Sequence, residues 1–242
     1  MGNQFDPGAY IQNLYTALEA QYRNDTEWTD WNNDRLYFMK EYVNNRNPRE
    51  MPDACFLSAL CFIARKDKSQ DILISAVMPK FLNNYGGDLR NIQTDNDCKN
   101  LGLYPKLVPY QWLINLSSHL REEHISFTEF LHNVEGLSGL EIRDELIRLI
   151  GSQSNFVKRI SVFIRDFLEK DTFGIDLNVR NVLRNVGLPL NEDVLVNRCR
   201  SVDIDPGRLE RLFYLHGKRM CQNKSCNTCP INTNCSDYRF NI

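Results

Sequence analysis

The chain has 242 residues, of which 42% are hydrophobic, 25% charged and 11% aromatic. This apolar content is enough for a buried core, so the composition excludes disordered and collagen-like chains. Apolar runs stay shorter than the ~18 residues of a membrane helix, and the first residues are polar, unlike a secretory signal. We therefore expect a soluble intracellular protein, cytoplasmic or nuclear, that is a monomer and has no membrane partner.

The charges are balanced overall but unevenly distributed. Lys and Arg number 29 and Asp and Glu 31, which gives a formal net charge of -2. This balance excludes a polycation that holds nucleic acid by bulk charge, although it permits local basic faces. The first fifty residues carry eight acids against five bases, whereas residues 211–242 carry five bases and a single acid, Asp237. The C-terminal end is therefore the part expected to meet an anion.

Apolar residues recur with the 3.6-residue period of helices, and no segment alternates as a half-buried strand does. The predicted helices span about residues 8–22, 33–43, 53–65, 70–83, 107–121, 126–134, 139–150 and 155–168. Another helix opens at Asp176, and two more cover about residues 191–199 and 205–217. No P-loop, HExxH or G-x-G-x-x-G motif is present. The sequence predicts an all-α fold.

Four of the eight cysteines lie close to the C-terminus. Cys221, Cys226, Cys229 and Cys235 are spaced C-x4-C-x2-C-x5-C. An intracellular setting disfavours disulfides, whereas four thiolates can close a tetrahedral zinc site or ligate a [4Fe–4S] cluster. Pro230, directly after the third cysteine, suits a tight loop around a bulky cofactor. The spacing alone predicts a metal or cluster site and leaves zinc and iron–sulfur open.

The segment that leads into these cysteines resembles a known family. It reads Arg211-Leu-Phe-Tyr-Leu-His-Gly-Lys-Arg-Met-Cys221 and is similar to the C-terminal part of endonuclease III-type DNA glycosylases. In that family a helix ending in Leu-His-Gly runs into the first ligand of a [4Fe–4S] cluster, usually spaced C-x6-C-x2-C-x5-C. The first gap is two residues shorter here, and the last two gaps match. The resemblance implies a [4Fe–4S] cluster, with zinc as the alternative.

The resemblance extends upstream and covers roughly residues 52–242. Residues 146–167 resemble the family's helix-hairpin-helix and the helix after it, although the usual Leu-Pro-Gly-x-Gly is replaced by Leu149-Ile-Gly-Ser-Gln-Ser-Asn155. The hairpin binds a DNA phosphate through backbone N–H groups and a helix N-terminus. The resemblance implies that Gly151, Ser152, Gln153 and Ser154 would take this role in this chain.

The resemblance also implies a catalytic pair. Lys158 would be the nucleophile that forms a Schiff base with the sugar C1′, and Asp176 the carboxylate that assists departure of the base. They are 18 residues apart, the separation found in the family's type member. The residues alone, without the resemblance, predict that Lys158 is a solvated surface lysine and that Asp176 is a helix N-cap. Capping and catalysis are compatible, because a helix N-terminus keeps a carboxylate ionised.

Further contacts follow from the same resemblance. Lys218, Arg219 and Lys224 could reach DNA phosphates, or be ordinary solvated bases. Arg65 stands where the family places a side chain that fills the gap left by an extruded base. His216 is expected to be a structural group near the cysteine ligands rather than an acid–base catalyst.

Together these features predict a two-lobed helix-hairpin-helix glycosylase fold. A six-helix lobe would span residues 52–168, and residues 1–51 with 169–242 would form the cluster lobe, with the catalytic pair at the mouth of the cleft between them. The implied activity is that of a bifunctional DNA N-glycosylase and abasic-site lyase. It would excise a damaged or mismatched base flipped out of double-stranded DNA, then cleave by β-elimination. Two alternatives remain: an inactive DNA-binding protein of the same fold, and an all-α zinc-binding interaction protein.

Overall fold

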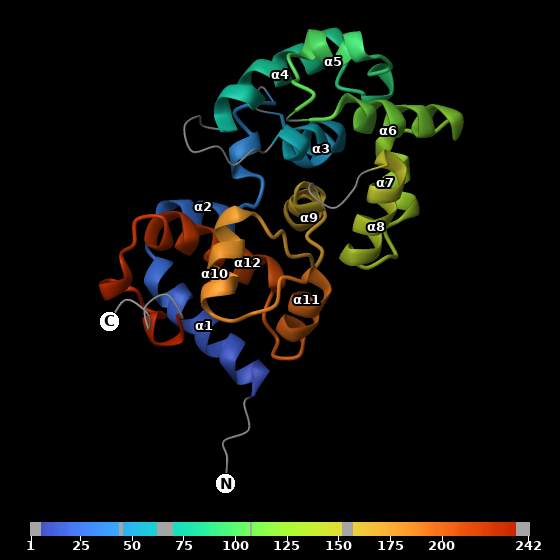
Figure 1. Cartoon of the computed structure of the whole chain (residues 1–242). Helices are drawn as coiled ribbons and strands as arrows, with labels where there is room; N and C mark the ends of the chain where they lie inside the picture. The colour runs from blue at the N-terminus through green and yellow to red at the C-terminus, as the bar shows by residue number, and fades with distance from the viewer. Residues whose placement is uncertain (1–5, 44–45, 62–69, 107, 152–156, 236–242) are drawn as a thin grey trace. The chain divides into compact units, whose positions relative to one another are not determined.

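The structure, a computed structural model, describes residues 6–43, 46–61, 70–106, 108–151 and 157–235 (Figure 1). All regular elements in these ranges are helical, so the prediction of an all-α protein is confirmed. The chain divides into two compact units. Unit 1 contains residues 1–34 and 171–242, and unit 2 contains residues 35–170. None of the helices within the described ranges is long and apolar enough to cross a membrane.

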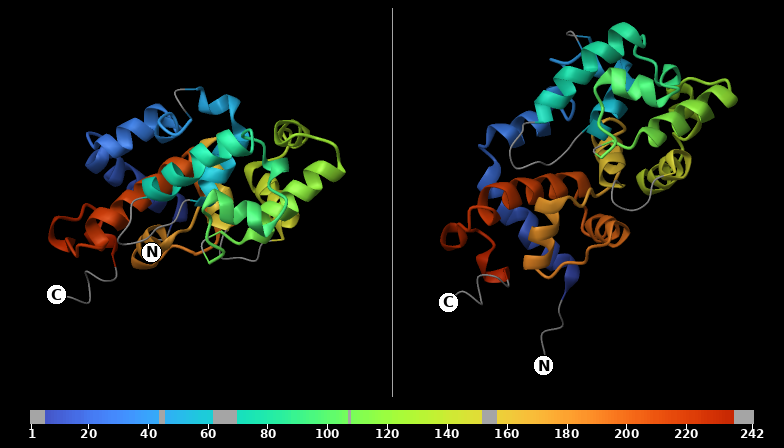
Figure 2. Two further views of the ribbon diagram at one scale, coloured as in Figure 1. Left: turned by 90° about the horizontal axis from the view of Figure 1, so that it is seen from above. Right: turned by 45° about the horizontal axis from the view of Figure 1, so that its top comes forward.

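Unit 2 is built around a helix that is buried along almost its whole length. Its helices are α3 (Pro52–Cys61), α4 (Gln70–Asn84), α5 (Asp95–Leu101), α6 (Tyr110–Glu122), α7 (Phe127–Asn133), α8 (Gly139–Ile150) and α9 (Val157–Asp166). Helix α3 packs against α4, α7 and α9, and Figure 2 shows these segments from two further directions. Phe56 of α3, Phe127 of α7 and Phe163 of α9 meet with ring centroids 5.0 to 5.9 Å apart. This aromatic contact joins three helices that are distant in sequence.

Three helices of unit 2 begin with the same local motif. In each, a Ser or Thr N-cap accepts a hydrogen bond from the backbone N–H three residues later, and an acidic side chain at that position reaches back to the N-cap. The pairs are Thr94 with Asp97, Ser126 with Glu129, and Ser138 with Glu141. This capping box satisfies backbone donors that a helix start leaves unpaired. It explains why α5, α7 and α8 begin where they do.

The predicted domain boundary at residue 52 needs correction. Residues 35–51 belong to unit 2, because Leu36, Met39 and Val43 are buried in its core. The predicted helix over 33–43 is also wrong: α2 (Thr26–Asn33) lies earlier, capped by the Asp25 carboxylate, and only a short 3-10 turn follows at Tyr37–Met39.

Unit 1 combines the two ends of the chain. Its helices are α1 (Pro7–Tyr22), α2, α10 (Leu177–Asn185), α11 (Glu192–Arg200) and α12 (Pro206–His216). Helix α12 packs against the other four, and nine of its eleven residues are buried. Blue α1 and orange-red α12 therefore lie side by side in Figure 1 although they are the first and last long helices of the chain. Residues 217–235, named here the cysteine loop, continue directly from α12.

One acidic side chain supports the start of α3. The Oδ1 atom of Asp53 accepts a hydrogen bond from the backbone N–H of Leu89 at 2.9 Å, which ties the turn Leu89–Asn91 to α3. Burial, assisted by the nearby charge of Asp88, raises the pKa of Asp53 to about 6. The folded protein therefore binds this proton more tightly than the unfolded chain does, so the ionised carboxylate opposes folding above that pKa.

Replacing this carboxylate should make the protein more stable in a pH-dependent way. Asp53→Asn keeps an amide oxygen for the Leu89 N–H and removes the charge. We expect the free energy of unfolding to rise by roughly 1 to 3 kcal/mol at about pH 8, and to change little at about pH 4, where the carboxyl is protonated in the folded state. Urea unfolding at both pH values measures this. An equal gain at both would show that burial of the charge is not the cause.

Candidate functional site

The four C-terminal cysteines surround one cavity in unit 1. Cys221, Cys226, Cys229 and Cys235 all line a partly open space of about 560 Å³. Its other walls include Val182 and Val186 of α10, His216 of α12, and Met220 and Ile231 of the cysteine loop. All four residues that the sequence singled out as ligands thus line the same cavity.

The cysteine loop reaches this position through an unusual turn. Helix α12 ends at His216, and a π-helical turn covers Gly217–Cys221. A Cβ atom on Gly217 would lie 2.5 Å from the backbone oxygen of Asn178, so only glycine permits this approach to α10. The side chain of Gln222 adds a hydrogen bond of 2.5 Å to Oδ1 of Asn178. Both contacts hold the loop against α10.

His216 stands between the loop and α1. Its side chain is 1% exposed. The Nε2 atom lies 3.3 Å from Sγ of Cys229, and the Nδ1 atom lies 3.2 Å from the hydroxyl of Tyr22. Burial lowers the pKa of His216 to about 4, so the imidazole is neutral near pH 7. This is the structural position near the cysteines that the sequence led us to expect.

The types of residue around the cavity suit a bulky group held by thiolates, although the present arrangement of these described residues is not that of a metal site. Four cysteines line the cavity, together with one histidine and several apolar residues. A cavity of about 560 Å³ leaves room for more than a single ion, and [4Fe–4S] clusters are held by four cysteine thiolates. Within the described ranges, no group of three or more His, Cys, Asp or Glu residues is arranged to hold a metal ion.

Asp176 begins α10, the helix that also supports the cysteine loop. Its Oδ1 atom accepts a hydrogen bond from the backbone N–H of Val179 at 2.8 Å, and the residue is 8% exposed. It is therefore an N-cap, as its sequence position suggests. The positive end of the helix dipole favours an ionised carboxylate here. Asn178, two residues further along, makes the contacts with Gly217 and Gln222.

Lys158 is the second residue of α9 in unit 2. Of the ten residues of this helix, only Val157, Lys158 and Val162 are not buried. The next residue, Arg159, turns inward and donates from Nη1 to the backbone oxygen of Leu60 at 2.6 Å, where α3 ends. Burial lowers the pKa of Arg159 to about 10. Lys158 therefore lies on the face of α9 away from the core of unit 2. The adjacent Arg159 is buried and bonded to the end of α3.

Gly151 ends α8 in the left-handed conformation, with φ of 68°. Its N–H donates to the backbone oxygen of Ile147. Asn115 of α6 donates from Nδ2 to the backbone oxygen of Ile150 at 3.0 Å, and the same nitrogen lies 3.0 Å from where a Cβ of residue 151 would be. Glycine is needed here for its conformation and for space. The other predicted contacts Ser152, Gln153, Ser154 and Arg65 lie outside the described residues.

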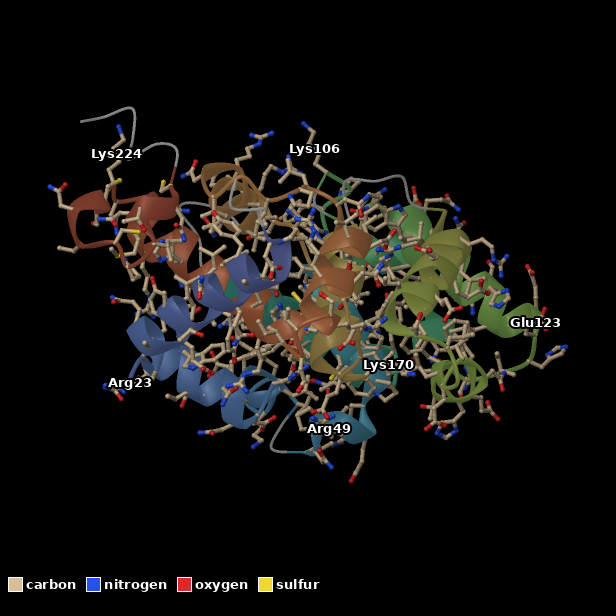
Figure 3. All side chains as sticks on the ribbon, turned by 90° about the horizontal axis from the view of Figure 1, so that it is seen from below. Arg23, Arg49, Lys106, Glu123, Lys170 and Lys224 are labelled. Carbon is tan, nitrogen blue, oxygen red and sulfur yellow. The ribbon has the colours of Figure 1, made fainter. Side chains whose placement is uncertain are left out.

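Two of the three bases expected to meet DNA are instead held by acidic side chains. Lys218 Nζ lies 3.0 Å from Glu27 Oε2, and Arg219 pairs with both Asp25 and Glu27. These carboxylates come from the start of α2, about 190 residues away in sequence. Lys224 is exposed at the tip of the cysteine loop (Figure 3), and it forms no ion pair with any other described residue.

Comparisons with known proteins assign no family to this chain. No protein-family model matches the chain, and no curated protein matches it. The chemistry of the site therefore follows from its motifs and from the geometry of each unit.

The close approach at residue 217 can be tested by adding one methyl group. Alanine is normally better than glycine in a helical turn by about 1 kcal/mol. We nevertheless expect Gly217→Ala to lower the free energy of unfolding by roughly 1 to 3 kcal/mol, because α10 must move away from the loop. Gly136→Ala is the control, since a Cβ there meets no atom within 4 Å. Urea unfolding measures both variants, and an unchanged stability of Gly217→Ala would contradict the contact.

Proposed function

We propose that the protein is a DNA glycosylase of base-excision repair, with an associated abasic-site lyase activity and a [4Fe–4S] cluster on Cys221, Cys226, Cys229 and Cys235. One observation carries this proposal. The four thiols line a single cavity directly after a helix that ends in Leu-His-Gly. This joins the motif of the family resemblance to a donor set suited to the family's cofactor.

The cluster's role would be structural. When bound, it would fix the four sulfur positions and so shape the exposed loop that carries Lys224. No step of base excision passes through it. The protein's own side chains perform the reaction, and the loop offers Lys224 as a cation for a DNA phosphate.

Lys158 would act as the nucleophile. Its position at the start of α9 opposes a positive charge on the side chain, because the helix N-terminus is itself positive. The neutral amine would form a bond from Nζ to the sugar C1′, while the base leaves with the electron pair of its glycosidic bond and takes up a proton. Opening of the sugar ring then gives a protonated Schiff base. Removal of a C2′ proton breaks the C3′–O bond and completes the β-elimination.

Asp176 would act as the carboxylate partner. An ionised carboxylate stabilises the positive charge that develops on the sugar as the base leaves, and it can accept the proton of the attacking amine. The hydrogen bond from Val179 and the helix dipole both favour the charged form.

We propose that Lys218 and Arg219 contribute less to DNA binding than the sequence alone predicts. Lys218 and Arg219 are already neutralised by Asp25 and Glu27, so a phosphate would have to compete with these carboxylates. The N–H of Gly151 is already bonded to the backbone oxygen of Ile147, so a phosphate contact proposed at Gly151 could not use that group.

Borohydride trapping on duplex DNA with an abasic site tests the reaction. Reduction converts a Schiff base into a stable protein–DNA adduct. We expect an adduct with the wild-type chain and none with Lys158→Ala, since the variant has lost the amine. Lys106→Ala, which removes an exposed lysine of the same unit, is the control and should give the wild-type adduct. Asp176→Asn preserves an N-cap, and we expect it to slow adduct formation by about 10² to 10⁴-fold.

The outcomes separate the alternatives. An adduct that persists in Lys158→Ala would refute the nucleophile. Wild-type protein that binds the DNA without forming an adduct would favour an inactive DNA-binding protein of the same fold. A colourless protein containing zinc and no iron would favour the zinc-binding interaction protein.

A further inference from the structure

Three polar side chains at the cysteine cavity are linked in sequence by two close contacts. Tyr22 is the last residue of α1, His216 the last of α12, and Cys229 lies in the cysteine loop. The Tyr22 hydroxyl is 3.2 Å from Nδ1 of His216, and Nε2 of His216 is 3.3 Å from Sγ of Cys229. Sulfur accepts hydrogen bonds at longer distances than oxygen, so both contacts are of hydrogen-bond length.

We propose that Tyr22 and His216 form a built-in hydrogen-bond relay that donates to one cluster ligand, Cys229, and raises the reduction potential of the cluster. This inference rests on the proposed [4Fe–4S] cofactor and assigns His216 as a positioning residue. It also gives Tyr22, which no sequence motif identifies, a role at the site.

The direction of the relay follows from proton counting. A ligating cysteine is a thiolate and can only accept a hydrogen bond. A neutral imidazole has one N–H and one acceptor nitrogen, so the hydrogen must be on Nε2 to serve Cys229. Nδ1 is then the acceptor, and the Tyr22 hydroxyl is its donor. Each of the two contacts thus requires the other to point in the same direction.

Burial keeps the relay in this state. Tyr22 is 4% exposed and His216 is 1% exposed, so water does not compete for either contact. The two rings meet edge to face with centroids 6.1 Å apart, which fixes the plane of the imidazole.

A donor on a ligand sulfur affects the cluster in two ways. It withdraws electron density from the thiolate, which stabilises the more reduced cluster and raises its reduction potential. It also orients the ligand, and loss of such a partner commonly weakens metal binding by about 10 to 100-fold. A merely structural role for His216 would affect folding but would not shift the potential in a variant that retains the cluster.

Four variants of the full chain test the relay. Tyr22→Phe removes only the distal hydroxyl, and His216→Leu removes the donor to sulfur. His216→Gln restores an N–H group close to the position of Nε2. Tyr15→Phe is the matched control, because it removes another hydroxyl from α1, one that bonds Glu19 instead. Each is purified anaerobically, its iron and sulfide are counted, and its potential is measured by a redox titration followed by electron paramagnetic resonance.

We expect the potential to fall in Tyr22→Phe and to fall further in His216→Leu. It should return towards the wild-type value in His216→Gln and stay unchanged in Tyr15→Phe. Iron loss to a chelator should be about tenfold faster in His216→Leu than in the wild type. If His216→Leu does not fold, Tyr22→Phe alone carries the comparison with Tyr15→Phe.

Three results would overturn the relay. An iron–sulfur cluster whose potential is the same in Tyr22→Phe, Tyr15→Phe and the wild type would refute it and leave the proposed cofactor intact. Loss of the cluster in His216→Gln but not in Tyr22→Phe would make His216 a ligand instead of a donor. A wild-type chain without iron would remove both the relay and the cofactor.

Discussion

The backbone contact between Gly217 and Asn178 is the constraint on which the site in unit 1 depends. It is possible only because residue 217 has no Cβ, and it fixes where the chain leaves α12. From that point the π-helical turn directs Cys221 and the rest of the loop around one cavity. The same contact joins the loop to α10, whose first turn holds Asp176. The candidate ligands and the candidate carboxylate thus share one support.

Local signals account for most of what the sequence could predict. The helices expected over about 8–22, 126–134 and 139–150 are confirmed within two residues of their ends, because caps and apolar periodicity lie within each segment. The short α5 was missed although Thr94 and Asp97 form a capping box, because only Cys98 and Leu101 of its seven residues are buried, which gives too few apolar positions for a periodic pattern. The spacing of the four cysteines drew attention to the part of the chain where all four line one cavity.

Contacts between distant segments could not be predicted in this way. Asp25 and Arg219 are 194 residues apart, and no periodic pattern signals their pairing. The basic C-terminal end therefore appeared available for DNA, whereas two of its bases are occupied by the acidic start of α2. Tyr22 was missed for the same reason, because it approaches His216 only through the packing of α1 on α12. The unequal charges of the two ends of the chain were visible in the sequence, but their mutual neutralisation was not.

The central claim is that Cys221, Cys226, Cys229 and Cys235 together hold a [4Fe–4S] cluster. Mössbauer spectroscopy of protein grown with ⁵⁷Fe and isolated anaerobically tests it most directly, combined with total zinc analysis of the same sample. The account predicts the spectrum of a four-iron cluster with all-thiolate ligation and little zinc, and loss of that spectrum in Cys226→Ser. About one zinc per chain with no cluster spectrum would contradict it.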